Sequence, residues 1–214
     1  MKIYINLRNS DSNTNGSQIK KLIDNDYPLR DKMTYLRDSL STIKLIPDGE
    51  NELIRFLING LGPKIYFPRK GDNSERFDAL IDFGDYKSVV EIEIPSTEIL
   101  DAPRNILDDY AVLKCRKKEK DSDIVPLVIC WDLPNKRTDY WNVITDIYTI
   151  LGIKIKTISI LALALHYWTK TPLDLRGDDY YLDHSNSSMI FTSHLLRKTG
   201  LSENDYPGYF TPYK

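Results

Sequence analysis

The sequence is poor in cysteine and has no long apolar run. Its two cysteines, Cys115 and Cys130, fit no zinc-binding spacing and are too few for a disulfide scaffold. The most apolar run, Ile158 to Leu165, is far too short to cross a bilayer, and Met1 to Arg8 lack the hydrophobic region of a signal peptide. We therefore expect a protein of a reducing cytoplasm without a membrane partner.

An excess of charge of one sign is also missing. The chain has 29 Lys and Arg against 31 Asp and Glu, a formal net charge of -2. This balance argues against a protein that is basic over its whole surface, although a local basic patch is still able to bind nucleic acid. The 214 residues suffice for one sizeable core and show no repeat or clear boundary, so we expect a single domain, 1–214.

Apolar periodicity predicts an α/β fold with a mixed central sheet flanked by helices. Residues 9–17 are polar and are expected to form a loop, whereas residues 161–169 leave helix and strand open. The expected helices are 50–61, capped by Asp48, one opening at Asp101, and 137–151; the expected strands include 64–67, 124–131 and 153–160.

An apolar stripe at helical spacing follows Tyr27. Its members are Leu29, Met33, Leu36, Leu40 and Ile43. The stripe is typical of a helix packed on the core, which is the interpretation we favour; the alternative is a helix–helix seam between two subunits.

The stretch from Phe77 to Pro95 is expected to form two strands joined by a turn at residues 83–85. Alternation of side chains puts Asp78 and Asp82 on one face of the first strand, and Glu91 and Glu93 on one face of the second. If the strands pair, these carboxylates converge. Like charges opposed across a sheet are destabilising, so their convergence indicates a hard divalent cation between them.

The spacing of Asp82, Glu91 and Glu93 suits phosphodiester hydrolysis, which needs a bound metal, an activated water and a neutralised leaving oxygen. We expect Asp82 and Glu91 to bind Mg²⁺ and Glu93 to take the proton of the water or to hold a second metal. Asp78 is the alternative to Asp82 as the first acid.

The other interpretation of this pattern is a solvated, charged strand face. Val89, Val90 and Ile94 speak against it, because they indicate a largely buried strand. Unpaired carboxylates on such a strand would be costly, and this favours the metal site.

The segments Arg76–Asp78, Ile81–Gly84 and Val90–Glu93 resemble the PD-(D/E)xK nuclease superfamily, in particular the BamHI and BglII branch of type II restriction endonucleases. Glu93 stands where most of the superfamily has lysine. The resemblance implies a restriction-endonuclease-like fold with a catalytic core over about residues 48–160. The resemblance does not extend to the N-terminal or C-terminal 45 residues, and we expect the N-terminal helices and residues 170–214 to be additions for dimerisation or DNA recognition.

In activity, the resemblance implies a Mg²⁺-dependent endonuclease of a prokaryotic cytoplasm. It would be a homodimer that cuts double-stranded DNA at a short, palindromic site. A further acid from the preceding helix is implied, for which Glu52 is the candidate. The candidate DNA contacts are the cationic side chains near the hairpin and at the end of the next helix: Arg69, Lys70, Arg76, Lys117 and Lys118.

Two rival functions remain at this point. One is another nuclease of the same fold, such as a repair or junction-cleaving enzyme or the cleavage subunit of a heterodimeric restriction system. The other is a catalytically silent DNA-binding module. The intact acids at positions 82, 91 and 93 speak against silence, because a module that only binds DNA has no need of all three.

Overall fold

The computed structural model describes residues 8–68, 77–116, 123–183, 186 and 188–213. The strands are β1 (Lys64–Tyr66), β2 (Ala79–Asp82), β3 (Lys87–Glu93), β4 (Ile124–Cys130) and β5 (Lys156–Ser159). The helices are α1 (Arg8–Ile23), α2 (Leu29–Arg37), α3 (Leu40–Leu45), α4 (Gly49–Leu61), α5 (Ala102–Arg116), α6 (Asp139–Leu151), α7 (Ile160–Thr169) and α8 (Ile190–Lys198), with a 3-10 turn at Glu203–Asp205.

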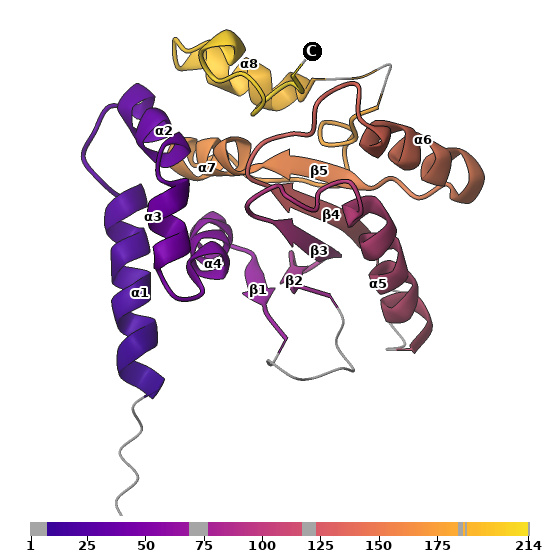
Figure 1. Cartoon of the computed structure of the whole chain (residues 1–214), viewed down its shortest axis with the longest axis horizontal. Helices are drawn as coiled ribbons and strands as arrows, with labels where there is room; N and C mark the ends of the chain where they lie inside the picture. The colour runs from indigo at the N-terminus through magenta and orange to yellow at the C-terminus, as the bar shows by residue number, and fades with distance from the viewer. Residues whose placement is uncertain (1–7, 69–76, 117–122, 184–185, 187, 214) are drawn as a thin grey trace, which may run out of the picture.

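The strands form one five-stranded sheet in the order β1-β2-β3-β4-β5. The β1–β2 and β2–β3 pairs are antiparallel, whereas the β3–β4 and β4–β5 pairs are parallel. Figure 1 shows α5 and α6 along one side of the sheet and α4 beside the other, and α7 follows directly from β5. The expected mixed sheet flanked by helices is confirmed.

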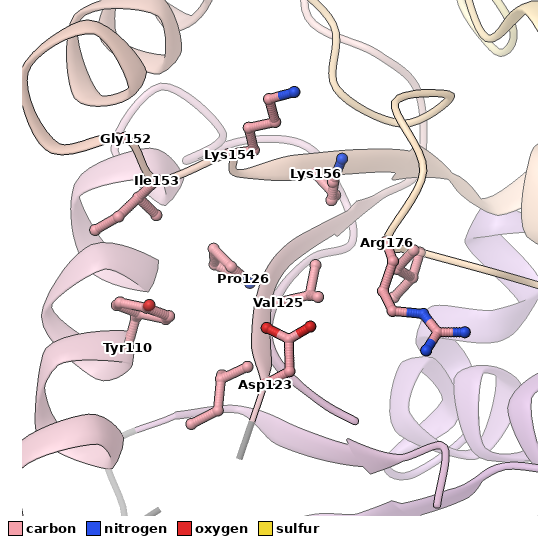
Figure 2. A pocket seen from close by; sticks show the side chains of 11 residues that line it. Tyr110, Asp123, Val125, Pro126, Gly152, Ile153, Lys154, Lys156 and Arg176 are labelled. Atoms are coloured by element: carbon pink, nitrogen blue, oxygen red, sulfur yellow. The ribbon is translucent and has the colours of Figure 1, made fainter. Parts of the chain in front are cut away.

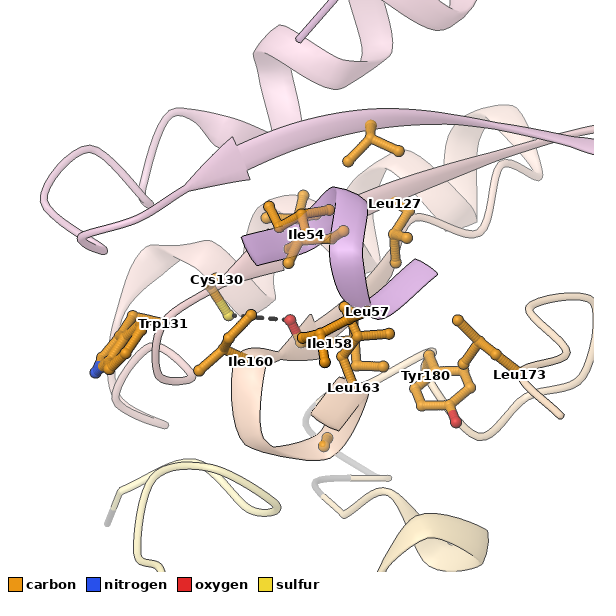
Figure 3. Packing of buried hydrophobic residues seen from close by; sticks show 14 of the residues in the cluster. Ile54, Leu57, Leu127, Cys130, Trp131, Ile158, Ile160, Leu163, Leu173 and Tyr180 are labelled. Atoms are coloured by element: carbon orange, nitrogen blue, oxygen red, sulfur yellow. Dashed lines mark hydrogen bonds between the residues drawn. The ribbon is translucent and has the colours of Figure 1, made fainter. Parts of the chain in front are cut away.

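The core lies between the sheet and the helices. Every residue of β4 is buried, as expected for a strand covered on both faces. Figure 3 shows Ile54 and Leu57 of α4 gathered with Leu127, Ile158 and Leu163, all without exposed surface. In the described part of the chain, no helix is long and apolar enough to cross a membrane.

The polar segment 9–17 is helical, so the expectation of a loop is wrong. It is the first part of α1, whose later residues Ile19, Leu22 and Ile23 are buried. α1 packs against α4, and the Asn15 side-chain amide donates to the Pro47 carbonyl at 3.0 Å. Tertiary packing of one helical face therefore outweighs the weak helix propensity of the segment.

The apolar stripe after Tyr27 belongs to two helices, α2 and α3, rather than one. The break coincides with Ser39, whose hydroxyl donates to the Leu36 carbonyl at 2.7 Å and so offers the backbone an alternative to the helical bond. Met33, Leu36 and Ile43 have no exposed surface within the single chain. The stripe therefore packs on the core, in agreement with the favoured interpretation.

Side-chain caps explain one helix start and leave another unexplained. Residues 161–169, for which the sequence left helix and strand open, form a helix. Ser159, the last residue of β5, is the N-cap of α7, and its hydroxyl accepts a hydrogen bond from the Ala162 N–H at 3.3 Å. Asp48 stands at the N-cap of α4 as expected but makes no capping hydrogen bond, and its carboxylate accepts from the Asn51 side chain instead.

Both ends of the described chain are tied to the same core. The Trp168 indole of α7 donates to the Ile23 carbonyl at 3.1 Å, and the Tyr206 hydroxyl donates to the Arg30 carbonyl at 3.2 Å. The Ser159 hydroxyl bonds to the Tyr209 carbonyl. These bonds connect the C-terminal segment to both β5 and α2.

Ile43→Ala is expected to lower the free energy of unfolding by about 2–4 kcal/mol, because it leaves a cavity in the core. The matched control is Leu45→Ala on the same helix, where the side chain is 84% exposed and a change within about 0.5 kcal/mol is expected. Urea denaturation at two protein concentrations measures both. A loss for Ile43→Ala that depends on protein concentration would instead indicate a seam between subunits.

Candidate active site

The register of the hairpin brings Asp78, and not Asp82, to Glu91. Ala79 pairs with Val90 across the antiparallel strands, so Asp78, one residue earlier, comes level with Glu91. Residues that are directly opposite in such a pair share a face of the sheet. The Asp78 carboxylate also accepts a hydrogen bond from the Ile92 N–H at 2.8 Å. Asp78 is therefore fixed against β3 between Glu91 and Glu93.

Asp82 lies at the other end of the hairpin, next to the turn. It pairs with Lys87, four residues before Glu91, which corresponds to about 13 Å along the strand. Its carboxylate accepts from the Gly84 N–H at 2.8 Å and so stabilises the turn. This register shows that Asp82 does not converge with Glu91 and Glu93, contrary to the expectation. Asp78 lies next to them instead.

Glu91 is a carboxylic acid in a poorly solvated position. Only 9% of its surface is exposed. Burial raises the pKa of Glu91 to about 7; the Asn105 side chain opposes the rise, and Asp78, Asp109 and Glu93 add to it by repulsion. The group is therefore poised to gain or lose a proton close to neutral pH.

Glu93 has a similar environment two residues further along the same face. It is 8% exposed, and burial raises its pKa to about 6. The Glu98 N–H opposes this rise, whereas the charges of Glu98, Asp78 and Asp101 add to it. Burial also raises the pKa of Asp78, and the Ile92 N–H lowers it. Burial is thus the largest cause of the raised pKa in all three acids, and repulsion by neighbouring carboxylates adds to it for Glu91 and Glu93.

Helix α5 covers this face of the hairpin. Its Asn105 side chain donates to a Glu91 carboxylate oxygen at 3.0 Å. Asp109, one turn further on, is 5% exposed and close enough to raise the pKa of Glu91. Neither Asn105 nor Asp109 is among the site residues expected from the sequence; the available signal is their spacing of four on a helix whose other inward side chains are apolar.

The donor set fits a hard divalent cation in chemistry. Carboxylate oxygens are the ligands that Mg²⁺ prefers, and a cation between Asp78, Glu91 and Glu93 would offset the repulsion that adds to the effect of burial on the pKa values of Glu91 and Glu93. Among the described residues, however, no three Asp, Glu, His or Cys side chains are arranged tightly enough to hold a metal ion. Binding there requires the three carboxylates to draw closer together.

Glu52, the expected additional acid, lies elsewhere. It sits on α4, pairs with Arg55 at 3.2 Å, and lines a cavity of about 410 Å³ with Lys20 and Tyr167. It is therefore not brought to the hairpin acids. The expected DNA contacts lie outside the described residues: Arg69, Lys70, Arg76, Lys117 and Lys118.

A second cavity, of about 270 Å³, opens at the amino ends of β4 and β5, away from the acids (Figure 2). Lys154, Lys156 and Arg176 line it together with Asp123. Figure 2 shows the Lys154 amino group extending away from Asp123. Lys154 forms an ion pair with Asp178 at 2.8 Å, and Arg176 forms one with Asp85 at 2.6 Å. The charges of Lys154 and Arg176 are therefore balanced by neighbouring carboxylates.

Comparison with known proteins gives a distant likeness of fold. No protein-family model matches the chain, and no characterised protein matches it in sequence. The solved structure of the restriction endonuclease FokI is similar over 82% of this chain, with 13% sequence identity and a TM-score of 0.44. The chain spans about a third of that protein, 33% of its length. Such a likeness concerns the arrangement of elements alone and carries no argument about activity.

Replacing Glu91 by Gln is expected to change how stability depends on pH. The unfolded Glu91 releases its proton near the ordinary value of 4.5, whereas the folded protein keeps it until about pH 7. The free energy of unfolding therefore falls as pH rises through this window, by on the order of 1–3 kcal/mol from this group. Glutamine cannot titrate, so Glu91→Gln is expected to lose that part of the slope.

Urea denaturation of the wild type and of Glu91→Gln between about pH 5 and pH 8 measures the difference. The comparison cancels other titrating groups, such as buried His166, whose pKa is lowered by burial. Parallel pH profiles for the two proteins would show that Glu91 keeps an ordinary pKa in the folded state.

Proposed function

We propose that this protein is a divalent-metal-dependent nuclease that hydrolyses phosphodiester bonds of double-stranded DNA. Its active site would be formed by Asp78, Glu91 and Glu93. The observation that carries the proposal is the convergence of these carboxylates on one face of a hairpin, where Glu91 and Glu93 are buried. In the described part of the chain, none of the three forms an ion pair with Lys, Arg or His. Buried carboxylates without a cationic partner are costly to keep unless a ligand uses them.

Each acid has a separate task in this proposal. Asp78, directly before β2, and Glu91 on the adjacent strand β3 would hold Mg²⁺. Mg²⁺ bound there would lower the pKa of water and offset the negative charge of the phosphate. Glu93, with its pKa raised to about 6, would accept the proton of the attacking water close to neutral pH, or act as a further ligand.

We further propose that cleavage is site-specific, as in type II restriction enzymes, at a short palindromic site cut by a homodimer in the cytoplasm of a prokaryote. Support comes from the resemblance of Ile81–Gly84 and Val90–Glu93 to the BamHI and BglII branch. Symmetric dimers match palindromic DNA because each subunit meets the same half-site. The nuclease core would be residues 48–160, with the two ends adding dimer or DNA contacts.

Asp78→Asn, Glu91→Gln and Glu93→Gln are each expected to reduce Mg²⁺-dependent cleavage of plasmid DNA by about 100-fold or more, because each removes a ligand or the proton acceptor. Asp82→Asn is the matched control: it is the same substitution in the same hairpin, at the last residue of β2, where the carboxylate accepts from the Gly84 N–H. It is expected to retain most of the activity. Full activity of Asp78→Asn together with loss in Asp82→Asn would reverse the assignment of the first acid.

The type of product tests the finer proposal. Discrete fragments from a known DNA are expected, and sedimentation of the complex with a cut-site duplex is expected to show two chains of 24.8 kDa. Nicked circles or junction products would favour another nuclease of this fold. DNA that stays intact with Mg²⁺ and Mn²⁺ would leave a binding module.

A further inference from the structure

Each carboxylate of the proposed centre is held by a neutral donor. Asp78 accepts from the Ile92 N–H, and Glu91 accepts from the Asn105 side-chain amide at 3.0 Å. The Glu98 N–H stabilises the charged form of Glu93. Two of these donors are backbone groups that any sequence would supply. Asn105 is the exception, because its side chain reaches the centre from a different element.

Asn105 is placed by the packing of α5 on the sheet. The helix contacts both β3 and β4 and buries Ala102, Ile106 and Leu113. These side chains fix the rotation of the helix about its axis, and Asn105 lies beside Ile106 with part of its surface exposed to solvent. The amide therefore meets Glu91 at the edge of the core, where a substitution removes the donor without opening a cavity.

The chemistry of this contact suits a carboxylate that has to bind a cation. Lysine or arginine at the same place would neutralise Glu91 and compete with the metal. An amide carries no charge, so it fixes the orientation of one oxygen and leaves the negative charge of the group available. Outer partners of this kind tune metal affinity although they do not touch the metal.

We propose that Asn105 is a positioning residue of the nuclease centre, whose amide holds the Glu91 carboxylate in the orientation that takes up the divalent cation. This inference rests on the proposed function of Asp78, Glu91 and Glu93. It differs from a purely structural role, in which the hydrogen bond would only fasten α5 to the hairpin. In a positioning role, loss of the Asn105 amide lowers the affinity for the metal. In a purely structural role, it lowers the stability and leaves the affinity unchanged.

The test compares Asn105→Leu, which has similar size and no donor, with Asn105→Gln, which keeps an amide. Asn142→Leu is the matched control, because Asn142 is an exposed amide on the neighbouring helix α6 that also donates to a carboxylate, that of Asp139. Calorimetric titration of each protein with Mn²⁺ alone, without DNA, gives the affinity. Urea denaturation without metal gives the stability.

Asn105→Leu is expected to bind Mn²⁺ about 10- to 100-fold more weakly than the wild type. Asn105→Gln is expected to recover part of the loss, and Asn142→Leu to bind as the wild type does. In DNA cleavage, the Mg²⁺ concentration for half-maximal rate rises for Asn105→Leu, and saturating Mg²⁺ restores much of the rate.

Wild-type Mn²⁺ affinity in Asn105→Leu would overturn the positioning role and leave the proposed nuclease standing. A loss of stability in Asn105→Leu with unchanged affinity would show that the contact is structural. Absence of both Mn²⁺ binding and DNA cleavage in the wild type would instead remove the proposed function itself, and the positioning role with it.

Discussion

The candidate site depends on how β3 is paired on its two sides. On one side β3 runs antiparallel to β2, and this register brings Asp78 level with Glu91. On the other side it runs parallel to β4, whose residues are all buried. A strand in this position has little access to water, so charged side chains at its end are poorly solvated. Burial at that position is the largest cause of the raised pKa values of Glu91 and Glu93.

Burial favours the protonated form of these acids and so raises their pKa values. The neighbouring groups determine the size of this rise. Repulsion among Asp78, Glu91 and Glu93 adds to it, whereas the N–H donors of Ile92, Asn105 and Glu98 oppose it. All of these donors are neutral. The charged forms are thus oriented without being compensated, which is the condition under which a divalent cation gains most from binding.

The rest of the molecule supplies the rigidity that such a site needs. α5 is held on β3 and β4 by apolar contacts, and α4 and α7 cover the other side of the sheet. The two ends of the described chain are bonded to this core through Ile23, Arg30 and Ser159. A substitution in the core is therefore expected to destabilise the whole fold.

Local sequence patterns predict much of the fold and part of the candidate site. Alternation alone predicts the hairpin and puts Glu91 and Glu93 on one face, and the continuous apolar run at 124–131 predicts a strand buried on both faces. These predictions succeed because the period of a strand or helix is a property of neighbouring residues. The segment 9–17 fails for the opposite reason, since its helix depends on contacts with α4 that no local pattern contains.

The sequence by itself therefore determined the mixed sheet, the acidic hairpin and the pair Glu91 and Glu93. Only the tertiary structure decided that the acid opposite Glu91 is Asp78 rather than Asp82, because register depends on the turn and on pairing between strands. It alone brought Asn105 to Glu91, 14 residues apart in the chain, since the angle of α5 on the sheet is set by the packing of Ile106 and Leu113.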